Sequence, residues 1–205
     1  MPTYKTEQEQ FWAGEFGTEY AGRNQSDVLL AANVSFFSKI VQRTGPVSSI
    51  TEFGANIGMN LKALRTLLPE AQLRAVDINS SACTQLRQLP KVEVLEGSFL
   101  DVDGGPADLA FVKGVLIHIN PDRLPDAYAA LERTGKKWVL IAEYYNPSPV
   151  EVNYRGHSGR LFKRDFAGEF LSKFAGWQLA DYGFLYRRDP VFPQDDISWF
   201  LLRRG

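Results

Sequence analysis

The chain has 205 residues, of which 44% are hydrophobic and 23% charged, and its formal net charge is −1 at pH 7. This composition is typical of a globular protein with a substantial core, so we expect one domain over residues 1–205. The balanced charge provides no basic field for nucleic acid, and apolar runs such as Trp138 to Ala142 are too short to cross a bilayer, so neither partner is expected. Cys83 is the only cysteine, which excludes an intrachain disulfide and favours a reducing, cytoplasmic compartment.

Residues 1–45 are expected to form an N-terminal helical cap. Aromatic side chains occur before the first core helix, at Phe11, Trp12, Phe16 and Tyr20. Their spacing suits a helix that docks on the core, and it also suits a lid over a pocket, with Arg23 or Asn24 reaching inward.

Beyond residue 45, apolar segments of strand length alternate with amphipathic helical segments. This alternation is typical of a parallel sheet covered on both faces. After a first strand that ends near Glu52, the pattern predicts strands at Leu73 to Asp77, Val92 to Phe99, Ala107 to Lys113, Lys137 to Glu143, Trp177 to Arg187 and Ile197 to Arg203. Helices are expected at Ser26 to Arg43, Asn60 to Leu68, Ser80 to Gln88, Asp122 to Thr134 and Arg164 to Phe174.

The last two strands are close in sequence, which favours an antiparallel pair. The predicted fold class is therefore α/β, a doubly wound, mostly parallel seven-stranded sheet with an antiparallel terminal strand. Residues 144–164 stand out as a long connection that contains Pro and Gly and leaves the carboxyl end of the fifth strand. Ligands of open α/β sheets bind at such ends, so we expect a substrate loop here.

A glycine turn follows the first strand, in the segment Glu52-Phe53-Gly54-Ala55-Asn56-Ile57-Gly58. Such a turn brings backbone N–H groups close to a bound cofactor, although glycine turns also serve packing alone. The spacing differs from the three-glycine dinucleotide motif, and no phosphate-binding lysine follows. An acid at the strand end without a phosphate site favours a cofactor with a cationic head, S-adenosylmethionine, over NAD or ATP.

Later strand ends carry groups that suit the rest of such a cofactor. Asp77 lies about twenty residues beyond Gly58, the offset expected for a carboxylate that binds both ribose hydroxyls; a helix cap near Ser80 is the alternative. Phe99 or Leu100 can form an apolar wall for adenine, and Ser98 or Asp101 can contact its edge.

Two histidines are candidates for catalysis. His118 follows the fourth strand at the rim where an acceptor arrives, and imidazole suits proton transfer; a hydrogen-bonded packing residue is the alternative. His157 lies in the long connection beside Arg155, where it either contacts substrate or is solvated. Two histidines and one cysteine show no metal-ligand spacing, so no metal is expected.

Residues for acceptor binding are expected beside these histidines. Glu143 could orient a base or bind an amine, and Tyr144 and Tyr145 could line the pocket. The long connection also concentrates positive charge, which suits an acidic small molecule or a solvated surface; its cations are Arg155, Arg160, Lys163 and Arg164.

The order of these features resembles the class I S-adenosylmethionine-dependent methyltransferases, over residues 46–205. More narrowly, the chain resembles the methylases associated with pseudaminic acid biosynthesis. Four segments carry that resemblance: Phe11-Trp12-Ala13-Gly14-Glu15-Phe16-Gly17 with Tyr20, Arg23 and Asn24; Glu52-Phe53-Gly54-Ala55-Asn56-Ile57-Gly58-Met59-Asn60; Lys113-Gly114-Val115-Leu116-Ile117-His118-Ile119-Asn120-Pro121; and Tyr154-Arg155-Gly156-His157 followed by Lys163-Arg164-Asp165-Phe166.

The resemblance implies where each part of S-adenosylmethionine lies. The methionine moiety is placed near Glu52, Gly54 and Gly58, and Asn56 replaces a more usual glycine. Asp77 holds the ribose, Ser98 and Phe99 border the adenine, and the Lys113 carbonyl lies near the sulfonium or the methionine ammonium.

We therefore expect an S-adenosylmethionine-dependent methyltransferase that modifies a hydroxyl or amine of a small, acidic, sugar-related acceptor. One alternative is a binding protein of the same fold that has lost catalysis. An NAD-dependent oxidoreductase is disfavoured by Asn56 and by the glycine spacing. The sequence leaves the oligomeric state open.

Overall fold

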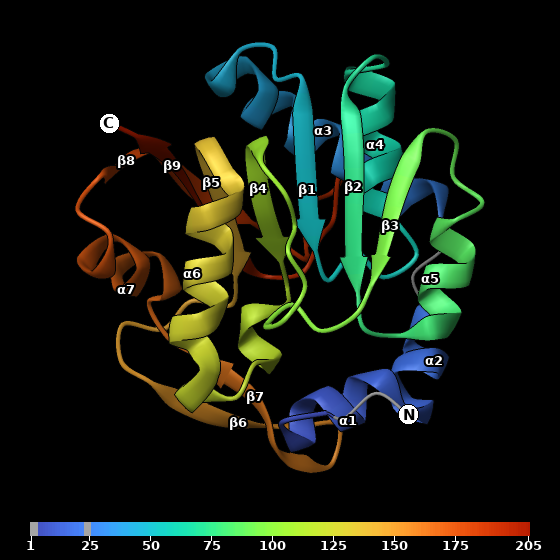
Figure 1. The fold of residues 1–205 in the computed structure, drawn as a ribbon, viewed down its shortest axis with the longest axis vertical. Coiled ribbons are helices and arrows are strands. Elements are labelled where there is room, and N and C mark those ends of the chain that lie inside the picture. Colours follow the sequence, from blue (N-terminus) through green and yellow to red (C-terminus); the bar gives the residue numbers. More distant parts are fainter. Residues whose placement is uncertain (1–3, 23–25) are drawn as a thin grey trace.

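A seven-stranded sheet runs through the centre of the computed structural model, which describes residues 4–22 and 26–205 (Figure 1). Its order is β3-β2-β1-β4-β5-β9-β8. The strands are β1 (Ser49–Phe53), β2 (Gln72–Asp77), β3 (Val92–Glu96), β4 (Ala107–Lys113), β5 (Gly135–Glu143), β8 (Trp177–Leu185) and β9 (Ile197–Arg204).

The predicted fold class is confirmed. Strands β1 to β5 pair in parallel, whereas β9 pairs antiparallel with both β5 and β8. The last strand of the chain is thus inserted between β5 and the edge strand β8. The strand order reverses direction between β1 and β4, the type of position where open α/β sheets bind ligands.

Helices cover both faces of the sheet, because its strands alternate apolar residues toward each side. On one face, α3 (Asp27–Thr44), α4 (Met59–Leu67) and α5 (Ser80–Leu86) pack on a cluster that includes Ile50 and Phe111. On the other face, α6 (Leu124–Thr134) and α7 (Phe166–Lys173) pack on a cluster that includes Phe53 and Ile141. Two short 3-10 turns, η1 (Leu116–His118) and η2 (Pro121–Arg123), connect β4 to α6. None of the described helices is both long and apolar enough to cross a membrane.

The connection at 144–164 is more regular than the loop that we expected. It contains a hairpin of β6 (Val150–Tyr154) and β7 (His157–Lys163). Tyr154 pairs with His157, and the two turn residues Arg155 and Gly156 have φ of 51° and 87°. Two positive φ values are typical of the tight turns that fit the twist of a hairpin. The short polar strands hid this pairing in the sequence.

The N-terminal segment is helical, as α1 (Glu7–Ala13) and α2 (Glu15–Ala21). Helix α1 begins with a capping box, in which Thr6 and Glu9 each accept a hydrogen bond from the other's backbone N–H. Both helices and the β6–β7 hairpin gather at the end of the molecule toward which β1 points (Figure 1). Arg23 and Asn24, which we expected to reach inward, lie outside the described residues.

Candidate functional site

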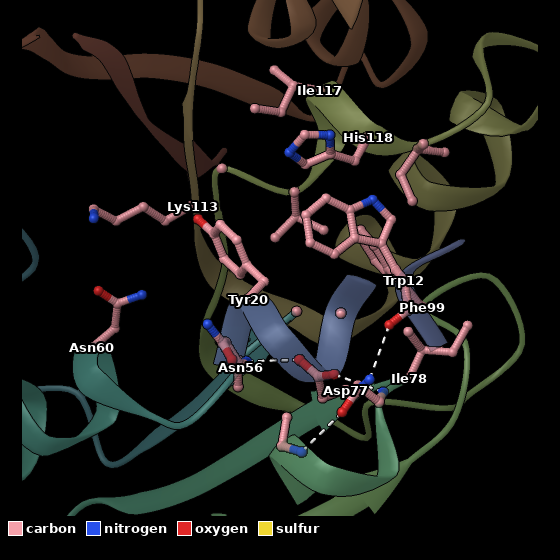
Figure 2. Close-up of a pocket in the computed structure, with 18 of the residues that line it drawn as sticks. Trp12, Tyr20, Asn56, Asn60, Asp77, Ile78, Phe99, Lys113, Ile117 and His118 are labelled. Atoms are coloured by element: carbon pink, nitrogen blue, oxygen red, sulfur yellow. Dashed lines mark hydrogen bonds between the residues drawn. The ribbon is translucent and has the colours of Figure 1, made fainter. Parts of the chain in front are cut away.

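A cavity of about 500 Å³ lies at the carboxyl ends of β1, β2 and β4, beneath α1 and α2 (Figure 2). This volume is in the range of small-molecule and cofactor sites. Predicted site residues on its wall are Gly54, Asn56, Asp77, Ser98, Phe99, Lys113, His118 and Tyr144. The sequence did not single out other wall residues, including Asn33, Asn60, Asn79, Gln194 and Asp195.

The glycine turn after β1 folds back onto β2. The N–H groups of Gly54 and Ala55 both donate to the carbonyl of Val76, at 2.8 and 3.1 Å. Gly54 has φ of 74°, and an added Cβ would lie 2.5 Å from a methyl of Val115. Glycine is therefore needed where the turn passes beneath the β4 loop, and the backbone of the turn lines the cavity.

Asp77 holds the same turn from the end of β2. Its two carboxylate oxygens accept the backbone N–H groups of Asn56, at 2.7 Å, and Asn79, at 2.8 Å (Figure 2). Burial raises the pKa of Asp77, and these amide hydrogen bonds oppose that rise. The amide of Ile78 also acts on this carboxylate, which keeps a further lone pair to accept from a ligand.

The alternative role of Asp77 as a helix cap is wrong. Asn79 caps α5, because its Oδ1 accepts the N–H of Ala82 at 3.1 Å. Its amide nitrogen donates to the carbonyl of Trp12, at 3.1 Å, and to Oγ1 of Thr18, at 3.2 Å. Asn79 thus ties the end of β2 to α1 and α2. A local pattern could have predicted the cap, but not the contact with residues more than sixty positions away.

The segment after β3 forms another wall of the cavity. Phe99 stacks on Phe53 with ring centroids 4.3 Å apart. The Ser98 hydroxyl donates to Oε1 of Glu9, and it accepts the N–H of Leu100 at 3.1 Å. Glu9 is buried and lies on the cavity wall, a position that sequence reasoning missed because α1 is remote from β3 along the chain.

Buried charges gather behind the glycine turn. Glu52 is not on the cavity wall; its Oε1 accepts from Nδ2 of Asn60 at 2.6 Å, and burial raises its pKa to about 8. Burial also lowers the pKa of Lys113, against the opposing charges of Glu52, Asp195 and Glu143. Of these three acids only Asp195 is on the cavity wall, where its carboxylate can meet a positive charge on a ligand.

Gly58 lies away from the cavity as well, although we predicted a cofactor contact there. It has φ of 80° at the start of α4, and an added Cβ would lie 2.5 Å from Leu89 and 2.9 Å from Leu86. Its small size serves the packing of α4 against the α5 region.

His118 is on the cavity wall, next to Trp12 and Tyr154, at centroid distances of 4.5 and 5.0 Å. In Figure 2 it lies beyond Trp12 as seen from Asp77. Its Nδ1 is 2.7 Å from the carbonyl of Arg160; because a carbonyl only accepts, Nδ1 carries the hydrogen and Nε2 keeps a lone pair. Burial lowers the pKa of His118 to about 4, so the imidazole is neutral at pH 7.

His157 is not on the cavity wall. It lies at the start of β7, exposed, with its ring against Phe11 and Phe16 at 5.1 and 5.9 Å. The hairpin turn directs it to the outer side of α1. Arg155 at the same turn is also absent from the wall and lies over the Tyr154 ring.

Two more predicted acceptor residues are displaced from the cavity. Tyr145 is 43% exposed and packs on Phe200, because consecutive residues of an extended segment point in opposite directions and Tyr144 is the one that faces inward. Glu143 is buried, and its carboxylate accepts backbone N–H groups of the β4 loop rather than facing the cavity. The described residues contain no cluster that could hold a metal ion.

No protein-family model and no curated protein matches the chain. Among solved structures, a magnesium protoporphyrin IX methyltransferase from Synechocystis PCC 6803 with bound SAH is 14% identical, with 96% of this chain and 97% of that chain covered and a TM-score of 0.70. A 1,6-didemethyltoxoflavin N1-methyltransferase from Burkholderia thailandensis is 14% identical, with 100% and 93% covered and a TM-score of 0.69. The fold is that of the class I methyltransferases.

A glycopeptide N-methyltransferase complexed with sinefungin has the same fold, at 12% identity, 84% and 94% coverage and a TM-score of 0.62. Identities this low establish the methyltransferase fold, and the three neighbours are named for different acceptors. The acceptor therefore has to be inferred from the site itself.

Gly58→Ala should destabilise the protein by about 1–3 kcal/mol, because alanine is strained at positive φ and its Cβ meets Leu86 and Leu89. Denaturant unfolding measures the change. Gly176→Ala is the matched control, since nothing lies within 4 Å of a Cβ there and its φ is not positive. Equal stabilities of the two variants would contradict the packing role.

Asn79→Ser should loosen α1 and α2 while α5 stays capped, because serine caps helices but lacks the amide donors that reach Trp12 and Thr18. Loss of such hydrogen bonds predicts about tenfold faster hydrogen exchange over residues 7–21. Exchange at Ala82 is the internal control, since its N–H is held by the cap. Unchanged exchange in both segments would show that Asn79 is not the tether.

Proposed function

We propose that the protein is an S-adenosylmethionine-dependent methyltransferase that acts on a small-molecule acceptor. The observation that carries this proposal is the place of Asp77, whose buried carboxylate holds the glycine turn and borders the cavity. A carboxylate at the end of the second strand suits a ribose with both hydroxyls free. The turn offers backbone groups and no lysine for phosphate, which suits a cofactor without phosphates.

The remaining walls fit the other parts of this cofactor. Phe99 and Ile78 both border the cavity and provide apolar surface for adenine. At the other end, Asp195 borders the cavity and acts on Lys113, and its carboxylate suits the positive sulfonium and ammonium groups of S-adenosylmethionine. This charge distribution disfavours NAD, whose pyrophosphate is negative.

Methyl transfer requires little covalent chemistry from the protein. Methyl transfer is an in-line displacement in which the sulfonium leaves as a neutral thioether, so alignment and exclusion of water dominate. Helices α1 and α2 cover the cavity with Trp12 and Tyr20. They would exclude water once the cofactor and acceptor are bound.

His118 is placed to accept a proton from the acceptor. Its low pKa makes it a weak base in the free protein, but it leaves Nε2 unprotonated and able to orient a hydroxyl or amine. A hydroxyl becomes a strong acid as its oxygen gains the methyl group, so even a weak base can take the proton at that stage. A non-catalytic binding protein remains the alternative, and the position of His118 on the cavity wall favours catalysis.

For the acceptor we propose a small, acidic, sugar-related molecule, methylated on a hydroxyl or amine. Two of the four cations in the 144–164 connection are neutralised, since Arg160 pairs with Glu7 and Arg164 with Glu169. Arg155 and Lys163 lie over the Tyr154 and Tyr144 rings and have no ion pair within the described ranges. Neither side chain is on the cavity wall, so the acidic, sugar-related acceptor is proposed from the resemblance to pseudaminic acid-associated methylases, together with a cytoplasmic location.

Asp77→Ala should weaken binding of S-adenosylhomocysteine by about tenfold to a hundredfold, because hydrogen bonds to a buried carboxylate are lost. Isothermal titration calorimetry measures this, and Asp126→Ala is the surface control, since that carboxylate pairs with Arg123. Wild-type protein should not bind NAD. Tight NAD binding, or equal affinity of wild type and Asp77→Ala for S-adenosylhomocysteine, would refute the cofactor assignment.

His118→Asn should lower kcat by about 10²–10⁴-fold with unchanged S-adenosylhomocysteine affinity. Asparagine keeps a donor for the Arg160 carbonyl but removes the Nε2 lone pair. The assay follows S-adenosylhomocysteine release with a panel of acidic sugars, activated sugars and small amines. His157→Asn should turn over like wild type; if it alone loses activity, the roles of the two histidines are reversed.

A further inference from the structure

The carboxylate of Glu143 is buried at the end of β5 and is turned toward the neighbouring loop after β4. Its Oε1 accepts the backbone N–H groups of Val115 and Leu116, both at 2.9 Å, and its Oε2 accepts that of Ile117 at 3.5 Å. The residue is 2% exposed. One side chain thus satisfies three consecutive amides of a different segment.

These amides need a partner because the loop has no regular pairing of its own there. Leu116 and Ile117 are fully or nearly fully buried, and the N–H groups at the start of a helical turn have no acceptor within it. A buried N–H without a partner costs about 1–3 kcal/mol. Glu143 therefore fixes where η1 begins.

His118 is the last residue of η1, so its position depends on where that turn begins. Its backbone N–H donates to the carbonyl of Val115 at 2.9 Å, and its Nδ1 donates to the carbonyl of Arg160 at 2.7 Å. The imidazole is thus fixed from two sides, by the Glu143-held loop and by the hairpin strand β7. Val115, Ile117 and His118 all border the cavity.

We propose that Glu143 is a positioning residue, which sets the place of His118 in the cavity by binding the three amides of the β4 loop. This inference rests on the proposed function, in which His118 meets the acceptor. It assigns Glu143 a role through the loop, in place of direct contact with substrate.

The charge of Glu143 has a consequence for pH dependence. Burial raises its pKa to about 7, while the three amides and Lys113 oppose that rise. Tyr128 on α6 is a further titratable group near Glu143. Burial raises the pKa of Tyr128, the charges of Glu169 and Glu143 raise it further, and that of Arg164, which pairs with Glu169, lowers it. The ionised carboxylate is the stronger acceptor, so the loop should be held best above about pH 7 and less well below it. Burial lowers the pKa of His118 to about 4, away from this range, and raises that of Glu52, the other buried acid that acts on Lys113, to about 8.

The first test compares kcat of wild type and Glu143→Gln from about pH 6 to about pH 8, by S-adenosylhomocysteine release. Wild-type kcat should rise through about pH 7. In Glu143→Gln, kcat should be lower by about tenfold to a hundredfold, as expected for a displaced catalytic group, and the rise should be absent. Glu70→Gln, at an exposed site, is the control.

The second test does not require turnover. The chain has two histidines, so nitrogen-15 NMR of the imidazoles, assigned with His157→Asn, reports on His118 directly. Wild type should show a single Nδ1-protonated tautomer, and Glu143→Gln a mixture. Glu143→Asp keeps the charge but is too short to reach all three amides, so its tautomer mixture should lie between those of wild type and Glu143→Gln. If Glu143→Gln does not fold, Glu143→Asp is measured in its place.

Failure of the proposed function and failure of the positioning role of Glu143 would give different results. If wild type binds no S-adenosylhomocysteine, the proposed function is wrong, and the NMR result still decides whether Glu143 fixes His118. If wild type binds it, and Glu143→Gln keeps the wild-type kcat, pH profile and tautomer, the positioning role is overturned.

Discussion

The candidate site depends on one constraint, which is that backbone N–H groups in the turns beyond the parallel strands must find acceptors away from solvent. Two buried carboxylates accept hydrogen bonds from these N–H groups. Asp77 binds the amides of Asn56 and Asn79, and Glu143 binds those of the β4 loop. Each acid belongs to a strand adjacent to the turn that it holds, so the sheet itself positions the cavity walls. Ligand groups can then be met by a preformed surface.

The cover of the cavity is held differently from its walls. Helices α1 and α2 contribute little to the two main cores; Ala21 belongs to a small separate cluster with Ile57 and Ala82. Polar contacts, such as those of Glu9 and Asn79, dock this cover together with ring contacts such as that of Trp12 with His118. Segments with few buried apolar contacts open at lower free energy than the core does. The same cover can therefore exclude water during transfer and still open for exchange of cofactor and product.

The sheet could be predicted because its signals are local. Strand length, helical periodicity and the glycine turn each lie within a few consecutive residues, and the fold agrees with them. The site was only partly predictable, because its details depend on contacts between distant segments. The place of Asp77 in the site could be predicted from its distance along the sequence to the glycine turn. Glu9, in contrast, reaches the cavity only because α1 docks there. The position of His157 was not predicted, because the Arg155–Gly156 turn, which directs it outward, was not recognised as part of a hairpin.

The electrostatics of the cavity link the proposed cofactor to the proposed reaction. Glu52, Glu143 and Asp195 act on Lys113, and burial raises the pKa values of Glu52 and Glu143 to about 8 and about 7, so a nearby positive charge would favour their ionised forms. A bound sulfonium would stabilise the ionised carboxylates, and its loss on methyl transfer would remove that stabilisation. The free energy of these acids thus differs between the substrate and product states of the cofactor. A site with this charge distribution should bind the positive cofactor more favourably than its neutral product, relative to a neutral site of the same shape.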